Sequence, residues 1–315
     1  MSSAAPLKVH ETTQCPACGG EGWQAFRLGE HELRRCASCE LVYAPKYADP
    51  SDLYVEGYLF GGTDFGIDVA HPVFQAYLAD VAAKRMQMIE KANGGRGSFL
   101  DVGCGSGEVL AVAAERGWQA VGVEPVEQSA KHAVEVRGLD VRAALLEESG
   151  LPEKSYDVVG AFHVVEHMSD ATAFLRLITR WAKPGGLVVI ELPNWRSMIR
   201  RNGGEGWRHL RPLEHIAHYT PATLSATLSR AGLTPIVVRT PTFLSDTQAL
   251  DHQLNDLGLG APGRLTRLLG RSGEYKGQPR TMSRPSVAAP LRALEYAYDR
   301  AGVGEVVFAI ARVPG

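Results

Sequence analysis

The chain has 315 residues, of which 45% are hydrophobic and 22% are charged, and its formal net charge is −2. A chain of this size and composition can form one large core with a small accessory unit, and its near-neutral charge argues against wholesale wrapping by nucleic acid. It contains no run near the roughly 18 apolar residues of a membrane span and no secretion signal at its start, so we expect a cytoplasmic location and no membrane partner.

The first 45 residues carry four of the five cysteines. Cys15 and Cys18 form one C-x-x-C pair, Cys36 and Cys39 form a second, and 17 residues separate the pairs. This spacing predicts a zinc ribbon. Four thiolates fill a tetrahedral Zn²⁺ and leave no position for substrate, so the zinc is expected to be structural. Disulfides or redox-active thiols are the alternatives, and a reducing compartment disfavours both.

Within this first unit, 1–45, we expect a mobile tail over residues 1–12 and short strands at 33–36 and 41–43. Residues 46–97 follow as a connector and an amphipathic helix. The helix is predicted over 73–92, because apolar residues recur there at helical spacing.

The next segment predicts a strand, a glycine turn and a helix. Strand 98–102 is followed by Gly103, Gly105 and Gly107, then by a helix over 107–116 and a strand over 119–124 that ends in Glu124. An acid about 20 residues past such a turn is where a ribose diol is usually bound. The spacing is not the G-x-G-x-x-G of dinucleotide folds. Asp101 beside the turn would repel a pyrophosphate but suits an ammonium group.

Strands and helices continue to alternate through the remaining chain, which predicts an α/β, doubly wound parallel sheet with helices on both faces. The interval 243–303 does not belong to that minimal fold, and we interpret it as an insertion over the substrate side with a helix at 291–298. The expected elements are helix 126–137, strand 140–143, strand 156–162, helix 170–182, a break at 183–186, strand 187–192, a helix from Pro221 to Gly232, strand 235–240 and strand 305–313.

Two motifs carry a family resemblance. Asp101-Val-Gly-Cys-Gly-Ser-Gly107 resembles the first motif of class I S-adenosylmethionine-dependent methyltransferases, and Asp157-Val-Val with His163-Val-Val-Glu-His167 resembles their fourth-strand motif. The resemblance implies a Rossmann-like seven-stranded sheet whose last strand is antiparallel, within a cofactor-binding domain over 98–315. It also implies S-adenosylmethionine as cofactor. Relatives often carry a segment like Tyr54-x-x-x-Tyr58 that folds over the cofactor.

The same resemblance implies a set of cofactor contacts. The glycine turn with Asp101 lies at the methionine end, and Glu124 at the ribose. The loop after the third strand flanks the adenine, and the end of the fourth strand borders the sulfonium. The cofactor-binding candidates are Asp101, Gly103, Cys104, Gly105, Gly107, Glu124, Pro125, Leu145, Leu146, Phe162 and His163. We interpret Cys104 as a small residue in a crowded bend, because nothing in the sequence marks it as an activated nucleophile.

Methyl transfer is an in-line displacement that often requires a proton to be removed from the acceptor. Glu214-His215-Ile-Ala-His218-Tyr219 resembles a segment of zinc-ribbon methyltransferases acting on nucleotide-linked sugars and natural products, in which a histidine and a tyrosine assist deprotonation. The catalytic candidates are therefore His215 as the first choice of base, then His218, with Tyr219 and His167 beside them. Glu166-His167 is equally interpreted as a cap for the following helix. We expect no metal site among these histidines, because the cysteines already account for one metal.

Residues 196–211 contain five arginines against one acid, Glu205. They favour a small anionic acceptor, phosphorylated or nucleotide-linked. One alternative is an RNA or protein methyltransferase that uses the ribbon for recognition. Through residue 45, however, four basic residues face five acids. A second alternative is a non-catalytic ribbon protein on a vestigial scaffold, against which the intact Asp101, Glu124 and glycine turn argue. The sequence carries no signal for an oligomeric state.

Overall fold

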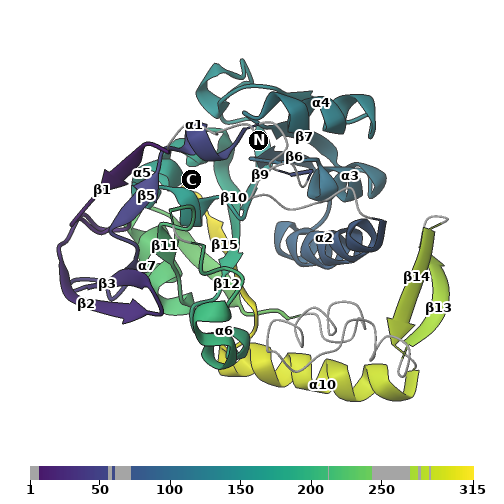
Figure 1. Cartoon of the computed structure of the whole chain (residues 1–315). Coiled ribbons are helices and arrows are strands. Elements are labelled where there is room, and N and C mark those ends of the chain that lie inside the picture. The colour runs from purple at the N-terminus through teal and green to yellow at the C-terminus, as the bar shows by residue number, and fades with distance from the viewer. Residues whose placement is uncertain are drawn as a thin grey trace, which may run out of the picture.

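The computed structural model describes residues 7–55, 59–60, 72–211, 213–242, 270–275, 278–283 and 285–315. A central sheet lies between two layers of helices, and a small sheet that includes the N-terminal cysteine segment packs beside one layer (Figure 1). No helix in this part of the chain is both long and apolar enough to cross a bilayer.

The central sheet has seven strands. β15 (Val306–Arg312) runs antiparallel to both of its neighbours, as expected for the last strand. The fold class is therefore confirmed as an α/β, Rossmann-like sheet. The strand order is β12 (Thr234–Arg239), β15, β10 (Ala182–Pro193), β9 (Tyr156–Phe162), β6 (Ser98–Val102), β7 (Gln119–Val123) and β8 (Val141–Arg142).

The direction of strand addition reverses between β6 and β9. From β6 the chain adds β7 and β8 toward one edge, and β9 then pairs with the opposite side of β6. Ligands of open α/β sheets bind at the carboxyl ends of the strands beside such a reversal. The topology therefore directs attention to the residues that follow β6, β7, β9 and β10.

Each face of the sheet buries its own apolar cluster. α2 (Pro72–Asn93), α3 (Glu108–Glu115) and α4 (Glu127–Glu135) cover one face, and α5 (Ala171–Thr179) and α7 (Pro221–Arg230) cover the other (Figure 1). Local signals fix the helix starts. The Asp170 side chain accepts a hydrogen bond of 2.8 Å from the Ala173 N–H, and α7 begins with Pro221 behind a Thr220–Thr223 capping box.

The predicted break before the fifth strand is wrong. β10 starts at Ala182, which pairs with Tyr156, and the register shifts before Leu187 pairs with Val158. Residues 183–186 are thus a bulge inside a longer strand, and Gly185 with φ 74° supplies its left-handed residue. The preceding helix ends at Thr179 and not at residue 182.

The small sheet also differs from the prediction. β3 (His31–Cys36) and β4 (Val42–Tyr43) match the expected strands, but β2 (Gly22–Leu28) adds a third and β11 (Ala217–His218) a fourth, in the order β11-β4-β3-β2. The expected mobile tail over residues 1–12 is wrong for 9–11, because β1 (Val9–Glu11) pairs with β5 (Lys46–Ala48), and residues 1–6 lie outside the described residues. A short helix, α1 (Pro50–Leu53), follows.

Residues 243–269 of the expected insertion lie outside the described residues, as does Tyr58 of the tyrosine segment. The later part of the insertion forms a hairpin of β13 (Gly270–Tyr275) and β14 (Gln278–Ser283), followed by α10 (Pro285–Ala301). α10 contains the predicted helix 291–298. Its Asp299 accepts a hydrogen bond of 2.6 Å from the Thr240 N–H, which anchors the helix to the end of β12.

Candidate functional site

The glycine turn after β6 is held against the end of β7. The N–H groups of Gly103 and Cys104 donate to the Val123 carbonyl at 2.8 and 3.1 Å. Gly103 has φ 70°, and a Cβ there would lie 2.8 Å from Val164. Gly107 has φ 85° at the start of α3, and a Cβ there would lie 2.5 Å from Leu139. Side chains at either position would clash and strain the backbone.

Glu124 follows β7, and its carboxylate connects the glycine turn after β6 to the loop after β7. One carboxylate oxygen accepts a hydrogen bond from the Gly105 N–H at 2.8 Å and the other from the Val126 N–H at 2.9 Å. Burial raises the pKa of Glu124, and these two N–H donors oppose that rise. Each carboxylate oxygen has a further lone pair, so the group can still accept hydrogen bonds from ligand hydroxyls.

Asp101, near the end of β6, is 2% exposed. Burial raises its pKa to about 7, helped by nearby Glu108 and Glu124 and opposed by the Arg85 cation. The carboxyl group is therefore close to half-ionised at neutral pH. A cation placed against it would favour its ionised form.

The other predicted cofactor residues lie in different surroundings. Pro125 is exposed beside Glu124, and Leu145 is exposed while Leu146 is buried in the core, so the two leucines do not share a surface. Phe162 is buried at the end of β9, under the Arg85 guanidinium. Cys104 is also buried, and burial raises the pKa of its thiol well above the ordinary value. That environment agrees with Cys104 as a packing residue.

A buried charge network that the sequence analysis missed lies beside this turn. Arg85 of α2 forms an ion pair with Glu191 of β10, with one Nε–Oε2 hydrogen bond of 3.0 Å. Arg85 and neighbouring His163 hold the pKa of Glu191 near 2 against the opposing effect of burial. The sequence did contain a signal for this network, because Glu191 is the one charged residue in the aliphatic run 187–192. A buried acid in such a strand requires a cationic partner.

His163 follows β9 and has φ 57°, which is rare for a residue other than glycine. Its Nδ1 lies 3.3 Å from Glu166 Oε1 and its Nε2 lies 3.4 Å from Glu191 Oε1. Burial lowers the pKa of His163, but the two carboxylates outweigh this effect and raise it to about 9. His163 is therefore cationic at neutral pH and does not act as a proton acceptor there.

His167 and His215 come together. Their ring centroids are 4.7 Å apart at an interplanar angle of 84°, and the His215 ring stacks on His209 at 6.0 Å. Burial, followed by neighbouring histidines and arginines, lowers the pKa values of His209 and His215 well below the ordinary value. Glu166 and His167 form the 3-10 turn η2 (Val165–His167). They do not cap α5, because Asp170 does.

His218 and Tyr219 lie apart from that pair. His218 packs against Trp195 at 5.0 Å and Trp207 at 6.0 Å, and burial, with Arg200, lowers its pKa to about 3. Tyr219 is fully buried in the core, and burial raises its pKa well above the ordinary value. Among the catalytic candidates, His167 and His215 thus form a pair whose rings contact each other.

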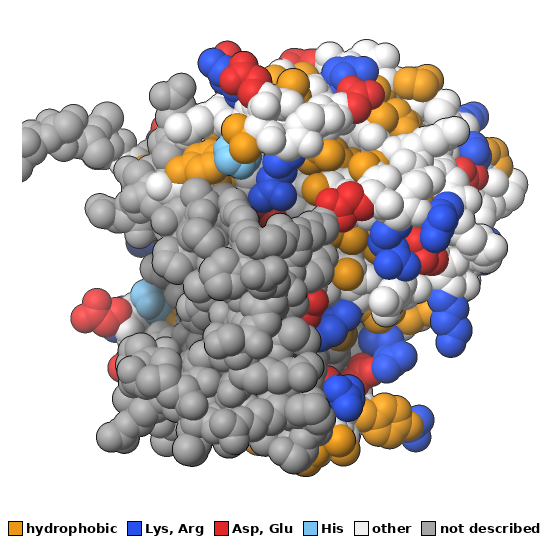
Figure 2. Space-filling view, turned by 90° about the vertical axis from the view of Figure 1, so that its right-hand side faces the viewer, with side chains coloured by type: hydrophobic (Ala, Val, Ile, Leu, Met, Phe, Trp, Pro, Cys, Tyr) orange, Lys and Arg blue, Asp and Glu red, His pale blue; other side chains and the backbone are white. Residues whose placement is uncertain are grey.

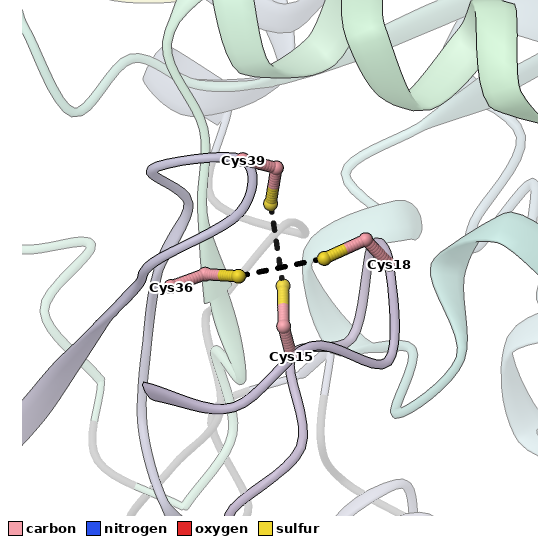
Figure 3. A group of neighbouring side chains, drawn as sticks. All are labelled: Cys15, Cys18, Cys36 and Cys39. Carbon is pink, nitrogen blue, oxygen red and sulfur yellow. Dashed lines mark hydrogen bonds between the residues drawn. The ribbon is translucent and has the colours of Figure 1, made fainter. Parts of the chain in front are cut away.

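The four N-terminal cysteines converge on one point (Figure 3). The Cys15–Cys39 and Cys18–Cys36 sulfur separations are 3.5 and 3.4 Å. A disulfide requires about 2.05 Å, whereas a tetrahedron of Zn–S bonds of about 2.3 Å separates its sulfurs by about 3.8 Å. The donor set and its spacing therefore fit Zn²⁺ and not disulfides.

The first cysteine turn docks on the helices of the central domain. The Pro16 carbonyl accepts a hydrogen bond of 2.9 Å from the Ala171 N–H at the start of α5. The Ala17 carbonyl accepts one of 2.7 Å from the Thr172 hydroxyl and one of 3.3 Å from Arg230. Cys15, Ala17 and Tyr43 belong to the same buried cluster as residues of the central sheet. The ribbon is therefore packed into the main core.

Three of the five arginines in 196–211 have structural partners. Arg208 pairs with Glu305 at 2.8 Å, Arg211 pairs with Glu214 at 2.9 Å, and Arg200 covers the Trp195 ring at 4.1 Å. Three of the five arginines are therefore engaged within the protein, and Arg196 and Arg201 are the two with exposed side chains.

Residues 74–238, just over half of the chain, match the family described as a methyltransferase domain. The ubiquinone biosynthesis O-methyltransferase of Bradyrhizobium sp. (strain ORS 278) is 33% identical over 138 residues, covering 40% of this chain and 53% of that protein. The corresponding enzyme of Methylobacterium nodulans is 32% identical over 151 residues, which cover 44% of this chain and 60% of that protein. The chain thus spans about half the length of the curated relatives it matches.

Solved structures of similar fold include an S-adenosylmethionine-dependent methyltransferase from Archaeoglobus fulgidus, with 22% identity and a TM-score of 0.47, covering 74% of this chain and 94% of that one. Another is a possible histamine N-methyltransferase from Thermotoga maritima, with 16% identity and a TM-score of 0.47, covering 75% and 91%.

Proposed function

The chain belongs to the methyltransferase-domain family, and from this premise we propose that it transfers the methyl group of S-adenosylmethionine to a small acceptor molecule. One observation carries the proposal. Asp101 and Glu124 lie at the ends of the adjacent strands β6 and β7, on either side of the glycine turn. One buried carboxyl group there can bind an ammonium and the other a ribose diol.

In this proposal the turn residues Gly103, Cys104, Gly105 and Gly107 line the methionine end with Asp101. Glu124 binds the ribose and Pro125 lies beside the adenine. The exposed Leu145 is the better of the two leucines for an adenine contact, since Leu146 is buried in the core. Phe162 and His163 border the sulfonium, and the Glu166 and Glu191 carboxylates balance the His163 charge there.

We assign the proton-accepting role to His215. Its lowered pKa keeps the imidazole neutral at pH 7, and a neutral imidazole can accept a proton. His163 is less suited, because its pKa of about 9 keeps it protonated. His218 and Tyr219 are enclosed by aromatic and core side chains, so we give them a positioning role in the same loop.

A cavity of about 230 Å³ supports a small acceptor. It lies between the β2–β3 hairpin and the loop after β10, and His215 and His218 reach it. Its charged lining is mixed and comprises Arg27, Glu30, His31, Glu32, Lys46 and Arg211. Together with the exposed Arg196 and Arg201, this lining supports an acceptor that carries an anionic group. The names of the curated relatives support an oxygen as the methylated atom.

The same proposal includes a structural Zn²⁺ bound by Cys15, Cys18, Cys36 and Cys39. It divides the chain into the ribbon at 1–45, the connector and helix at 46–97, and the methyltransferase domain at 98–315 with an insertion near 243–303.

The charge distribution supports a small acceptor over RNA. On the face that Figure 2 shows, Lys and Arg side chains of the described residues lie interspersed with Asp and Glu. A nucleic-acid surface would instead gather positive side chains.

The proposal is tested with methyl-labelled S-adenosylmethionine. The purified chain is incubated in parallel with phosphorylated sugars, nucleotide sugars, hydroxylated aromatic acids and total RNA. We expect label in a small-molecule pool and calorimetric binding of the cofactor. Label only in RNA, or no cofactor binding, would overturn the proposal.

A further inference from the structure

A second group of metal-ligating side chains lies beside the cofactor turn. Glu166 and His167 come from η2, and His215 comes from the loop before β11. One ligand atom from each residue lies within 4.8 Å of the other two. The three residues are 1%, 9% and 5% exposed, so the group is enclosed by protein.

Within the part of the chain that the structure describes, two buried polar atoms of this group have no hydrogen-bond partner. They are Oε2 of Glu166 and Nδ1 of His215. A buried carboxylate oxygen or imidazole nitrogen without a partner is costly, and each such atom requires an explanation. The other Glu166 oxygen faces His163 Nδ1 at 3.3 Å, so the partnerless oxygen is the one available to a ligand.

His167 is oriented as a metal ligand would be. Its Nδ1 lies 3.0 Å from the Glu214 carbonyl. A carbonyl can only accept, so Nδ1 carries the proton and Nε2 keeps its lone pair. That Nε2 lies 4.0 Å from Glu166 Oε1. Metal-ligating histidines commonly donate their second N–H to a backbone carbonyl in this way.

We propose that Glu166, His167 and His215 bind a divalent transition-metal cation, of the class that includes Zn²⁺, Co²⁺ and Fe²⁺. Two imidazoles and one carboxylate suit these ions, whereas Mg²⁺ and Ca²⁺ prefer oxygen ligands. Bonds of about 2.0–2.2 Å would bring the ligand atoms to about 3.4 Å from one another. The ligand atoms now lie within 4.8 Å of one another, so they would have to approach on binding. Three protein ligands leave a coordination position open, in contrast to the four-cysteine site.

The site has a consequence for methyl transfer, which rests on the proposed function. With the cation bound, His215 is a ligand and no longer accepts the acceptor's proton. A cation with an open position would instead lower the pKa of a hydroxyl that binds there, so that the hydroxyl releases its proton to water. Its oxygen would then form a bond to the methyl carbon as the bond from that carbon to the sulfonium sulfur breaks and a neutral thioether leaves. The expectation that these histidines hold no metal was based on the cysteines alone, and the geometry of this second group revises it.

The experiment titrates Co²⁺ into the metal-free full chain. Cobalt–thiolate charge-transfer absorption reports the cysteine site, and total bound cobalt counts both sites. We expect the wild type to bind one equivalent more than the Glu166→Gln/His215→Gln variant, with equal thiolate absorption. His209→Gln, which changes a neighbouring histidine outside the ligand set, should keep that equivalent.

Circular dichroism and S-adenosylmethionine calorimetry are run on the same preparations. Equal cobalt stoichiometry in the wild type and in the folded double variant overturns the metal site. If the folded double variant cannot be obtained, the His215→Gln single variant decides, since loss of a nitrogen ligand should raise the Kd for the second Co²⁺ at least tenfold. A stoichiometry difference without cofactor binding overturns the proposed methyl transfer and leaves the metal site standing.

Discussion

The backbone of His218 pairs with that of Val42, and the backbone of Ala217 pairs with that of Tyr43. The segment between β10 and α7 therefore contributes a strand, β11, to the cysteine-bearing sheet. His215 lies two residues before that strand, so the order of the cysteine site and the position of the candidate base are physically linked.

Cys39→Ser should loosen the second cysteine turn, because it removes one of the four proposed metal ligands. β4 follows that turn directly and holds β11. We expect faster amide exchange over 213–219 and at least a tenfold loss of turnover, with nearly unchanged cofactor affinity, by exchange mass spectrometry, activity assay and calorimetry. Ser38→Ala, in the same turn, is the control. Unchanged exchange over 213–219 in a zinc-depleted variant would contradict the link.

Glu124→Ala should weaken S-adenosylmethionine binding by about 1–3 kcal/mol, the cost of losing charged hydrogen bonds. It also frees the Gly105 and Val126 N–H groups that the carboxylate now holds. Calorimetry gives the affinity, and Glu127→Ala, at an exposed position in the first turn of α4, serves as the control. An affinity equal to that of the wild type would mean that the ribose binds elsewhere.

Cofactor affinity should depend on pH through Asp101, whose pKa is about 7. Only the ionised carboxylate pairs with an ammonium, so affinity should increase as the pH rises from 5.5 to 7.5. The increase should approach about tenfold per pH unit well below 7 and then level off. The stability of the ligand-free protein should change in the opposite direction. Between about pH 4 and 7 the folded state keeps the Asp101 proton and the unfolded state releases it, so the free energy of unfolding should fall as the pH rises through this range. Asp101→Asn should abolish both effects. A flat affinity profile from calorimetry in the wild type would exclude Asp101 as the ammonium site.

Arg85→Met should destabilise the fold by about 3–5 kcal/mol, because it removes one partner of the buried Arg85–Glu191 ion pair and leaves only His163 as a cation beside Glu191. Arg85→Met/Glu191→Met should recover much of that loss. Since the pKa of Glu191 is lowered to about 2, the pair contributes stability above about pH 4.5 that is lost as the pH falls toward 2. Urea unfolding measures these differences, with Lys91→Met on the exposed side of α2 as the control. A single variant as stable as the control would contradict the importance of the pair.

His215→Ala should lower turnover by about 10²–10⁴-fold, the range for loss of a general base, while cofactor affinity stays close to the wild-type value. The measurement pairs initial rates with calorimetry, and His10→Ala in β1 is the matched histidine change outside that loop. Full activity in the His215 variant would remove this residue from the mechanism.

Six of the seven strands of the central sheet contain an apolar run, which made them predictable, whereas β8 holds only Val141 and Arg142. β11 was not predictable, since Ala217 and His218 carry no local strand pattern and are extended only because Val42 and Tyr43 lie beside them. The bulge at 183–186 was missed for a related reason. Pro184 and Gly185 look like a break, but the pairing of Ala182 with Tyr156 keeps both ends of the segment in one strand.

The residue types in the sequence indicated where the candidate site lies, but not which of its side chains are protonated at neutral pH. Asp101, Glu124 and the glycines were found from their spacing. The contrast between His163, which is cationic, and His215, which is neutral, arises from Glu166 and Glu191 on one side and from burial on the other. Such differences depend on contacts between residues distant in sequence, and Arg85 lies 106 positions from its partner.

The contacts of Pro16 and Ala17 with α5 and α7 also bear on how this architecture can be altered. A foreign ribbon grafted at residue 45 would have to present two carbonyls to Ala171, Thr172 and Arg230 and offer a strand edge in register with Ala217. Interchange of such modules between enzymes should therefore succeed only when the ribbon and the segment from η2 to α7 are transplanted together.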